Sequence, residues 1–277
     1  MTVIRQEDLI RSIADAVQFI SYYHPVDFLR ALREAWENEE SPAAKAALTQ
    51  VLVNSRMCAT GKRPICQDTG IVNVLLEVGM QVQWQGDLSV EEMINEGVRQ
   101  GYMNPDNLLR ASVLYDPDGA RTNTSDNTPA VIHTRLVAGN KLSIEVAAKG
   151  GGSEAKAKFA MLNPSDSVVD WILSVVPTMG AGWCPPGILG VGIGGTPEKA
   201  MLLAKESLME PIDIHRLKAD GPVNRAETLR LELFEKVNAL GIGAQGLGGL
   251  TTVLDVKVKE FPTHAANKPV AVIPNCT

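Results

Sequence analysis

Apolar residues recur every three or four positions through most of the first 60 residues, a spacing that predicts amphipathic helices. In the first of these, Leu9, Ile13, Val17 and Ile20 fall on one helical face. Ser41, followed directly by a proline, is a suitable N-cap for the third. The helices predicted in this part of the chain cover residues 6–21, 24–40 and 41–60.

The pattern changes to one typical of strands after residue 70. Residues 71–86 are rich in β-branched and apolar side chains and predict a strand. Residues 131–150 alternate around Gly139 and Asn140, which predicts a hairpin with a two-residue turn. The polar segment 105–129 lies between them and predicts a long surface excursion, a kind of segment that is commonly functional.

Helices and strands follow one another in the rest of the chain without steady alternation. Residues 269–277 predict a closing strand. Because no series of βαβ units appears, the pattern predicts an α+β fold, with helices packed around antiparallel β-sheets in a single large domain spanning residues 1–277. The further helices predicted are at residues 88–103, 165–176, 196–209 and 226–240.

Composition excludes several functional classes. The chain has 277 residues, 45% hydrophobic and 21% charged, which is ordinary for a globular protein. A net charge of −6 disfavours a nucleic-acid binder, which needs clustered cations. No apolar run approaches the roughly 18 residues of a membrane span, and charges interrupt the N-terminus where a signal peptide would be apolar. A cytoplasmic location is expected, with no membrane or nucleic-acid partner.

Two glycine-rich segments are candidate ligand sites. Residues 190–195, GVGIGG, match G-x-G-x-x-G formally, but neither a βαβ unit nor the acidic residue about 20 positions on accompanies them. The remaining interpretation is a glycine loop before a helix N-terminus, which suits a carboxylate. Residues 149–153, KGGGS, form either a flexible turn or a series of backbone N–H donors that a ligand can approach closely.

The four cysteines are too few and too scattered for a disulfide framework and are expected to be thiols. Cys58 lies in a helical stretch and is expected to be a buried apolar residue. Cys66, Cys184 and Cys276 lie in loops bordered by Pro or Gly, but their separations of 118 and 92 residues match no compact metal-site spacing. Of the histidines, which show no zinc pattern, His264 is a candidate acid or base because it lies in a loop.

Six blocks, taken together and in order, resemble the class I, iron–sulfur-dependent fumarate hydratases. The resemblance covers essentially the whole chain and corresponds to the N-terminal, or α, part of these hydro-lyases. The blocks are PICQDTG, NLLRASVLYDP, AAKGGGSEAKAKFAMLNPSDS, PTMGAGWCPPGILGVGIGGT, LGIGAQGLGGLTTVLDVKV and HAANKPVAVIPNC.

The resemblance implies a [4Fe–4S] cluster in which one iron is not ligated by protein. The ligands would be Cys66, Cys184 and Cys276, and Cys58 falls outside the pattern. An iron left open in this way can act as a Lewis acid toward a bound hydroxyl group, which a cluster with four protein ligands cannot do.

The resemblance also implies the residues around the substrate. Asp68 and His264 would take part in proton transfer, and Gln67 would lie beside the substrate. Arg110 would hold a carboxylate, since its planar guanidinium can bind both oxygens. The backbone N–H groups that contact the substrate would come from Gly151 and Gly152.

The activity implied by the resemblance is the reversible hydration of fumarate to (S)-malate. The family's C-terminal, or β, domain or subunit is not present in this chain, so we expect a separate β partner, a homodimer, and little activity from the chain alone. Two alternatives remain: a dehydratase of another 2-hydroxy diacid such as tartrate, and a non-catalytic module that binds zinc or no metal.

Overall fold

The structure is a computed structural model that describes residues 2–276, and its chain forms two compact units. Unit 1 contains residues up to 23 together with 55–151, and unit 2 contains residues 24–54 together with those from 152 onward. The chain contains many helices, and its strands form several sheets, which confirms the α+β class. Among the described residues, no helix is both long and apolar enough to cross a bilayer.

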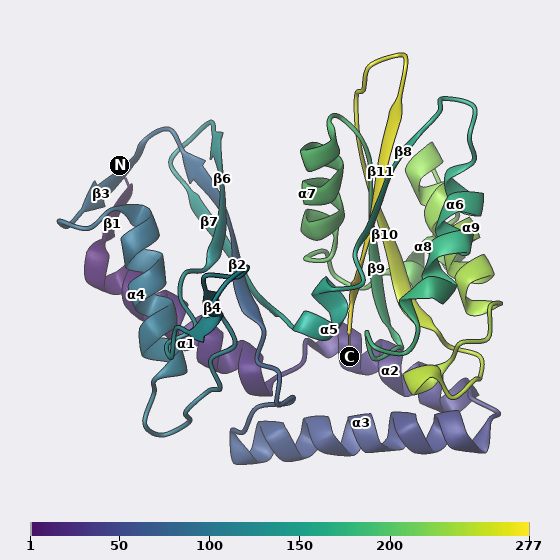
Figure 1. The fold of residues 1–277 in the computed structure, drawn as a ribbon, viewed down its shortest axis with the longest axis horizontal. Coiled ribbons are helices and arrows are strands. Elements are labelled where there is room, and N and C mark those ends of the chain that lie inside the picture. Colours follow the sequence, from purple (N-terminus) through teal and green to yellow (C-terminus); the bar gives the residue numbers. More distant parts are fainter. Residues whose placement is uncertain (1, 277) are drawn as a thin grey trace. The chain divides into compact units, whose positions relative to one another are not determined.

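Unit 1 is built on a three-stranded sheet in the order β6-β2-β7, with helices α1 and α4 packed together (Figure 1). Its core joins apolar residues of both helices to Val72, Val74 and Leu76 of β2. Gly97 of α4 allows close packing, because a Cβ there would lie 2.6 Å from Ile13 Cβ. The elements are β1 Thr2–Arg5, α1 Gln6–Tyr22, β2 Ile71–Gly79, β3 Val82–Gln85, α4 Val90–Tyr102, β4 Leu114–Tyr115, β5 Thr122–Asn123, β6 Val131–Val137 and β7 Leu142–Lys149.

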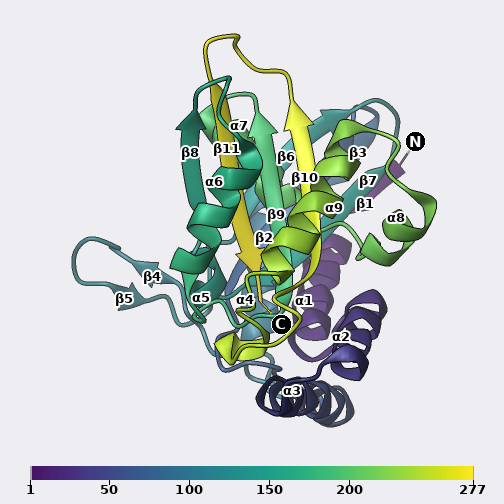
Figure 2. The same ribbon diagram turned by 90° about the vertical axis from the view of Figure 1, so that its right-hand side faces the viewer.

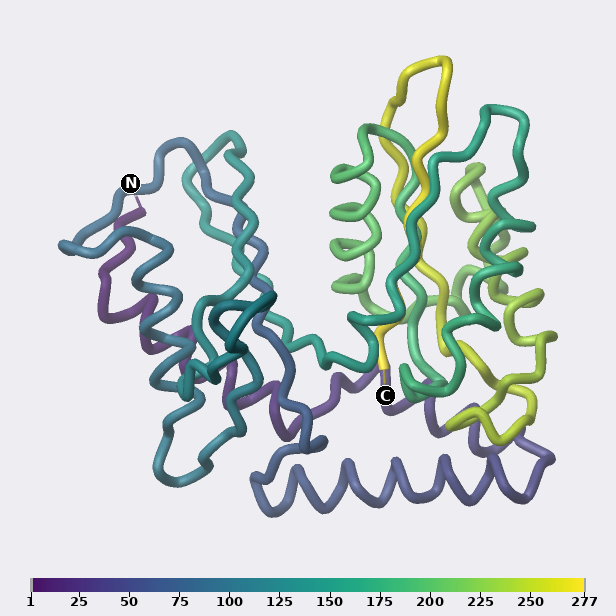
Figure 3. The backbone as a smooth tube through the Cα atoms, in the orientation of Figure 1, coloured from purple at the N-terminus to yellow at the C-terminus, as the bar shows by residue number. Residues whose placement is uncertain are grey.

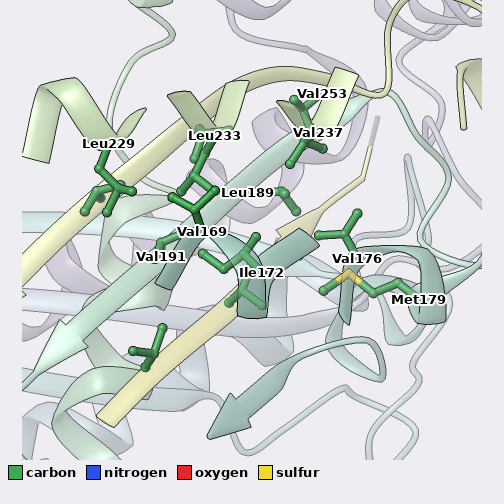
Figure 4. Close-up of a cluster of buried hydrophobic side chains, with 14 of the residues drawn as sticks. Val169, Ile172, Val176, Met179, Leu189, Val191, Leu229, Leu233, Val237 and Val253 are labelled. Carbon is green, nitrogen blue, oxygen red and sulfur yellow. The ribbon is translucent and has the colours of Figure 1, made fainter. Parts of the chain in front are cut away.

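Unit 2 is built on a four-stranded sheet in the order β10-β9-β11-β8 (Figure 2). Helix α7 covers one face of this sheet, and α6 and α9 cover the other (Figure 1). The core under α6 and α9 includes Ile172, Leu189 and Leu233, all fully buried (Figure 4). The elements are α2 Val26–Asn38, β8 Lys158–Leu162, α6 Val168–Val175, η1 Val176–Met179, β9 Gly187–Gly194, α7 Pro197–Ser207, α8 Ile214–Asp220, α9 Arg225–Asn238, η2 Ala244–Gly246, β10 Val253–Phe261 and β11 Lys268–Asn275.

Two helices cross the division between the units along the chain. Helix α3, Pro42–Gly61, passes from unit 2 to unit 1, and the short helix α5, Gly151–Glu154, begins where unit 1 ends. The N-cap predicted for α3 is confirmed, since the Ser41 hydroxyl accepts the Ala44 N–H at 3.5 Å. The predicted helices are confirmed within a few residues of their expected ends, whereas α8 had no predicted counterpart.

The predicted hairpin at residues 131–150 is wrong. β6 and β7 both pair with β2, which lies between them, parallel to β6 and antiparallel to β7. The connecting loop wraps around the end of β2, where Gly79 N–H donates to Lys141 O and Gln81 N–H to Gly139 O. Because β2 is largely buried, it takes the central position and excludes direct pairing of its neighbours.

The glycine loop expected at residues 190–195 is for the most part strand β9. A Cβ at Gly192 would lie 2.0 Å from Ala200 O, and one at Gly190 would lie 2.1 Å from Ala204 O. These glycines therefore let helix α7 pack closely on the sheet, and only Gly194 and Gly195 form the turn that leads to α7.

Candidate functional site

The PICQDTG turn, residues 64–70, connects α3 to β2 and is fixed at both ends. At its start, Ile65 N–H donates to Ser21 O at 2.8 Å, at the end of α1. At its end, Gly70 has a φ of +76°, and a Cβ there would lie 2.7 Å from the carbonyl carbon of Lys149. Only glycine combines this conformation with so close an approach.

Cys66 is exposed on this turn, and its sulfur has a backbone donor. The Asp68 N–H points at Cys66 Sγ at 3.4 Å, while the thiol donates to Gln67 Oε1 at 3.5 Å. Backbone hydrogen bonds to cysteine sulfur are a regular feature of iron–sulfur sites and help to set their potentials.

The Asp68 carboxylate links the PICQDTG turn to the KGGGS segment. One oxygen accepts the Gly70 N–H at 3.0 Å, and the other accepts the Gly151 N–H at 2.7 Å. A Cβ at Gly150 would approach the second oxygen to 3.1 Å. The amide that we expected to face a ligand therefore holds the carboxylate of Asp68 in this structure.

Arg110 lies next to the same turn. Its backbone carbonyl accepts a hydrogen bond from the Thr69 hydroxyl. Its side chain is exposed, and within residues 2–276 the guanidinium makes no hydrogen bond or ion pair. Unit 1 therefore brings together an exposed thiol, a held carboxylate and an unpaired cation.

Two buried side chains that support this turn were not predicted from the sequence. The Tyr102 hydroxyl donates to Thr69 O at 2.7 Å, and burial raises the pKa of Tyr102 to about 12. The Asn127 amide donates to Gly70 O at 2.9 Å. The dipeptide Asn-Thr before a proline is a turn signal, but it does not identify a contact 57 residues away.

Cys184 is exposed on the loop before β9 in unit 2. Its φ is +55°, and its N–H donates to Ala181 O at 2.9 Å. The following residue is also held, since Pro185 O accepts two hydrogen bonds from Gln245, one from the backbone and one from the side chain. The thiol is thus presented by a fixed loop.

Cys276 lies at the same end of the unit 2 sheet as Cys184. Figure 3 follows β11 from the loop after β10 to the end of the chain. Because β11 is antiparallel to β9, Asn275 pairs with Ile188 at the start of β9. A Cβ at Gly187 would lie 1.9 Å from Asn275 O, so the two segments that carry the thiols are in contact.

A pocket of about 280 Å³ in unit 2 includes Cys276 in its lining. His24 also lines it, with its ring stacked on Phe28 at 5.1 Å between centroids. Burial lowers the pKa of His24 to about 4, so the imidazole is neutral at pH 7. This histidine has no distinguishing sequence signal.

The KGGGS segment also contacts the Cys184 loop within unit 2. A Cβ at Gly152 would lie 2.6 Å from Gly182 O, and one at Gly182 would lie 3.6 Å from Lys156 Nζ. Within the described residues Lys156 has no ion-pair partner. The ammonium group of Lys156 therefore lies against the Cys184 loop at Gly182, two residues before Cys184.

The structure does not bring His264 to Cys276. His264 is exposed in the loop before β11, where its Nδ1 accepts the Ala266 N–H at 3.1 Å. The whole of β11 separates it from Cys276, and eight strand residues span about 26 Å. Its expected role in proton transfer stays a prediction.

The donor set fits an iron–sulfur cluster by its chemistry. All four cysteines are thiols; Cys66 and Cys184 are exposed and Cys276 is partly exposed, whereas Cys58 is buried and donates to Pro64 O. Thiolates are the usual ligands of such clusters. Within either unit, no three described His, Cys, Asp or Glu side chains form a metal-binding group. Joint binding by Cys66 of unit 1 and the two cysteines of unit 2 stays a prediction.

Comparison with known proteins agrees with these features. Residues 10–277 match the family model described as "Fumarate hydratase (Fumerase)". The chain is 35% identical over 262 residues to the "Putative L(+)-tartrate dehydratase subunit alpha" of Methanocaldococcus jannaschii, covering 92% of this chain and 89% of that protein. It is 28% identical over 271 residues to the L(+)-tartrate dehydratase subunit alpha of Escherichia coli K12, covering 97% and 87%.

Proposed function

We propose that this chain is the cluster-binding α subunit of an enzyme that reversibly hydrates fumarate to (S)-malate. The chain belongs to the fumarate hydratase (fumerase) family of iron–sulfur hydro-lyases. The observation that carries the proposal is the arrangement in unit 1. Cys66, Asp68 and Gly151 are joined by hydrogen bonds, and the backbone of Arg110 is bonded to the same turn.

Cys66, Cys184 and Cys276 would hold a [4Fe–4S] cluster in which one iron has no protein ligand. Such a cluster supplies a Lewis acid for the hydroxyl group that leaves malate or adds to fumarate. Exposed thiols on fixed loops, and the N–H of Asp68 directed at Cys66, support this ligand assignment.

The remaining residues would bind and orient the substrate. Arg110, whose guanidinium has no partner within residues 2–276, would bind one carboxylate through two parallel hydrogen bonds. Gln67 and the backbone at Gly151 and Gly152 would face the substrate. Asp68 would hold or release a proton at its carboxylate, a role that needs an oriented group within hydrogen-bond reach.

His264 would share in proton transfer as part of the same proposal. The variant His264→Gln tests this role of His264 in proton transfer. An unchanged pH–rate profile of the complete enzyme would remove His264 from the proposal.

Tartrate is the second candidate substrate, because the relatives reported above are named tartrate dehydratase subunits. Tartrate and malate are both four-carbon dicarboxylates with a hydroxyl group on carbon 2, and tartrate has a second hydroxyl group on carbon 3, so the same cation and thiol set would suit either. Rates with (S)-malate and L(+)-tartrate, measured in parallel on the complete enzyme, decide between them.

The relatives' names also support a second subunit, since each is a subunit alpha. We propose that a β subunit completes the active site and that the assembly contains two copies of this chain. Size measurement of the coexpressed complex tests the composition of the assembly, and the dependence of its rate on the β subunit tests whether that subunit completes the active site.

Anaerobic reconstitution with iron and sulfide tests the cluster. We expect a brown protein that loses one iron in air and then gives a [3Fe–4S] signal in electron paramagnetic resonance. Cys66→Ser, Cys184→Ser and Cys276→Ser should each reduce the bound iron and sulfide, whereas Cys58→Ser should not. Full cluster content in all three variants would refute the ligand assignment, and a colourless, air-stable protein would favour the non-catalytic alternative.

A further inference from the structure

We propose that Asn127 is a positioning residue that fixes Arg110 relative to the PICQDTG turn. The inference rests on the proposed function, in which Arg110 binds a substrate carboxylate. Asn127 itself is fully buried, so it is inaccessible to the substrate.

The side chain of Asn127 makes three hydrogen bonds that join two segments of unit 1. Its Oδ1 accepts the N–H of Ser112 at 2.7 Å and that of Val113 at 3.2 Å. Its Nδ2 donates to Gly70 O at 2.9 Å. Ser112 and Val113 directly precede β4 (Figure 1), and Gly70 ends the PICQDTG turn.

These bonds leave Arg110 fixed from both sides. On one side its carbonyl accepts the Thr69 hydroxyl, and on the other Ser112 is bonded to Asn127. The guanidinium has no partner of its own within residues 2–276. The position of the backbone therefore decides where the cation can reach, and the Asn127 side chain joins this backbone to the turn in addition to the Thr69 hydroxyl.

Asparagine suits this position for two reasons. Its φ is +63°, a left-handed conformation that Asn, Asp and Gly tolerate better than other residues. The carboxamide also offers an acceptor and a donor together, and Asp has no donor for Gly70 O. Asn127→Gly therefore removes all three bonds without adding backbone strain. Asn127→Asp keeps the acceptor for Ser112 and Val113, but it replaces the donor to Gly70 O by a buried carboxyl oxygen.

The test uses the chain coexpressed with its β subunit and loaded with cluster. We expect Asn127→Gly to raise KM by about tenfold, equivalent to one lost charged hydrogen bond, with a smaller change in kcat. Arg110→Met should raise KM more. In the Arg110→Met background, Asn127→Gly should change KM no further, because the cation that it positions is gone.

Asn238 is the matched control, because its side chain in unit 2 also accepts two backbone N–H groups and donates to one backbone carbonyl group. Its Oδ1 accepts the N–H groups of Thr252 and Val253, and its Nδ2 donates to Val253 O. Asn238→Gly should lower thermal stability, but its effect on KM should be small and unchanged by Arg110→Met.

A second measurement needs no activity. Hydrogen–deuterium exchange at the Ser112 and Val113 amides should become at least tenfold faster in Asn127→Gly and stay near the parent rate in Asn127→Asp. If Arg110→Met raises KM and Asn127→Gly does not, or the two effects simply add, the positioning role is wrong. If Arg110→Met leaves KM unchanged, the assigned role of Arg110 fails and this inference fails with it.

Discussion

His24 shows how burial changes the chemistry of a single residue. Its pKa is lowered to about 4 in the folded chain, and an unfolded histidine titrates near 6.5. A depressed folded pKa gives stability that is fully present above pH 6.5 and is lost as the pH falls toward 4. The whole effect amounts to about 3 kcal/mol in the free energy of unfolding.

We therefore predict that His24→Gln makes the cluster-free chain less sensitive to acid. Between pH 6.5 and pH 4, the parent should lose about 3 kcal/mol more of its free energy of unfolding than the variant does. Urea unfolding at several pH values measures both curves. Parallel loss of stability in the two proteins would show that the imidazole is not shielded from solvent.

At the scale of elements, the packing of α7 on β9 depends on glycine. We predict that Gly192→Ala lowers the free energy of unfolding by about 3 kcal/mol, since its Cβ would lie 2.0 Å from Ala200 O and the backbone must move. Gly61→Ala is the control, because the nearest atom to a Cβ there is 3.7 Å away. Thermal unfolding should separate the two, and equal midpoints would contradict the close packing.

Strand β10 carries a buried ion network that joins it to α9 and to the start of α8. Lys257 and Asp255 are 1% and 0% exposed, 2.9 Å apart, and Arg230 also pairs with Asp255. Desolvation raises the pKa of Asp213, but this carboxylate accepts hydrogen bonds from Lys257 and Arg230. Those bonds and the two positive charges outweigh desolvation, so the pKa of Asp213 is lowered. Removing one member of such a network leaves a buried charge uncompensated.

We predict that Lys257→Met lowers the free energy of unfolding by about 3 to 5 kcal/mol. Lys259→Met, two residues along the same strand, removes a more exposed pair with Glu210 and should cost less than about 1 kcal/mol. Urea titration of both variants gives the comparison. Similar small losses would mean that Arg230 alone compensates Asp255.

The elements predicted correctly are those whose signal is local. Helix α1 was predictable because its apolar stripe and its length are properties of one segment. The hairpin at residues 131–150 was wrong because the pairing of β6 and β7 depends on β2, a strand more than 50 residues earlier that separates them. Strand β9 was not predicted for a similar reason. Its glycines are required by the close packing of helix α7 on the strand, which no neighbouring residue in the sequence indicates.

At the scale of the whole molecule, the candidate site divides into a part that motifs predict and a part that they do not. PICQDTG and KGGGS were recognisable as blocks, and Asp68 and Gly151 are bonded to each other. Asn127 and Tyr102 support the same turn from sequence positions that carry no chemical signature. Their supporting roles become visible only in the fold, which places the carbonyl groups of Thr69 and Gly70 against their side chains.

Net charge leads to a prediction about the whole assembly. The chain carries −6 at pH 7, which opposes a dianionic substrate, and Arg110 is the cation whose backbone is bonded to the PICQDTG turn. A dicarboxylate needs a cation at each end, so we expect the β subunit to supply further positive groups. The cluster-loaded chain alone should turn over malate at least about 100-fold more slowly than the complex, the scale of losing one charge-stabilising donor.

Titration of the loaded chain with purified β subunit measures this dependence. The rate should rise and saturate at one β subunit for each chain. Cys66→Ser chain in place of the parent should give no rise, which separates a catalytic requirement from activity carried by the β subunit itself. Equal rates with and without the β subunit would mean that the described residues contain every cation the reaction needs.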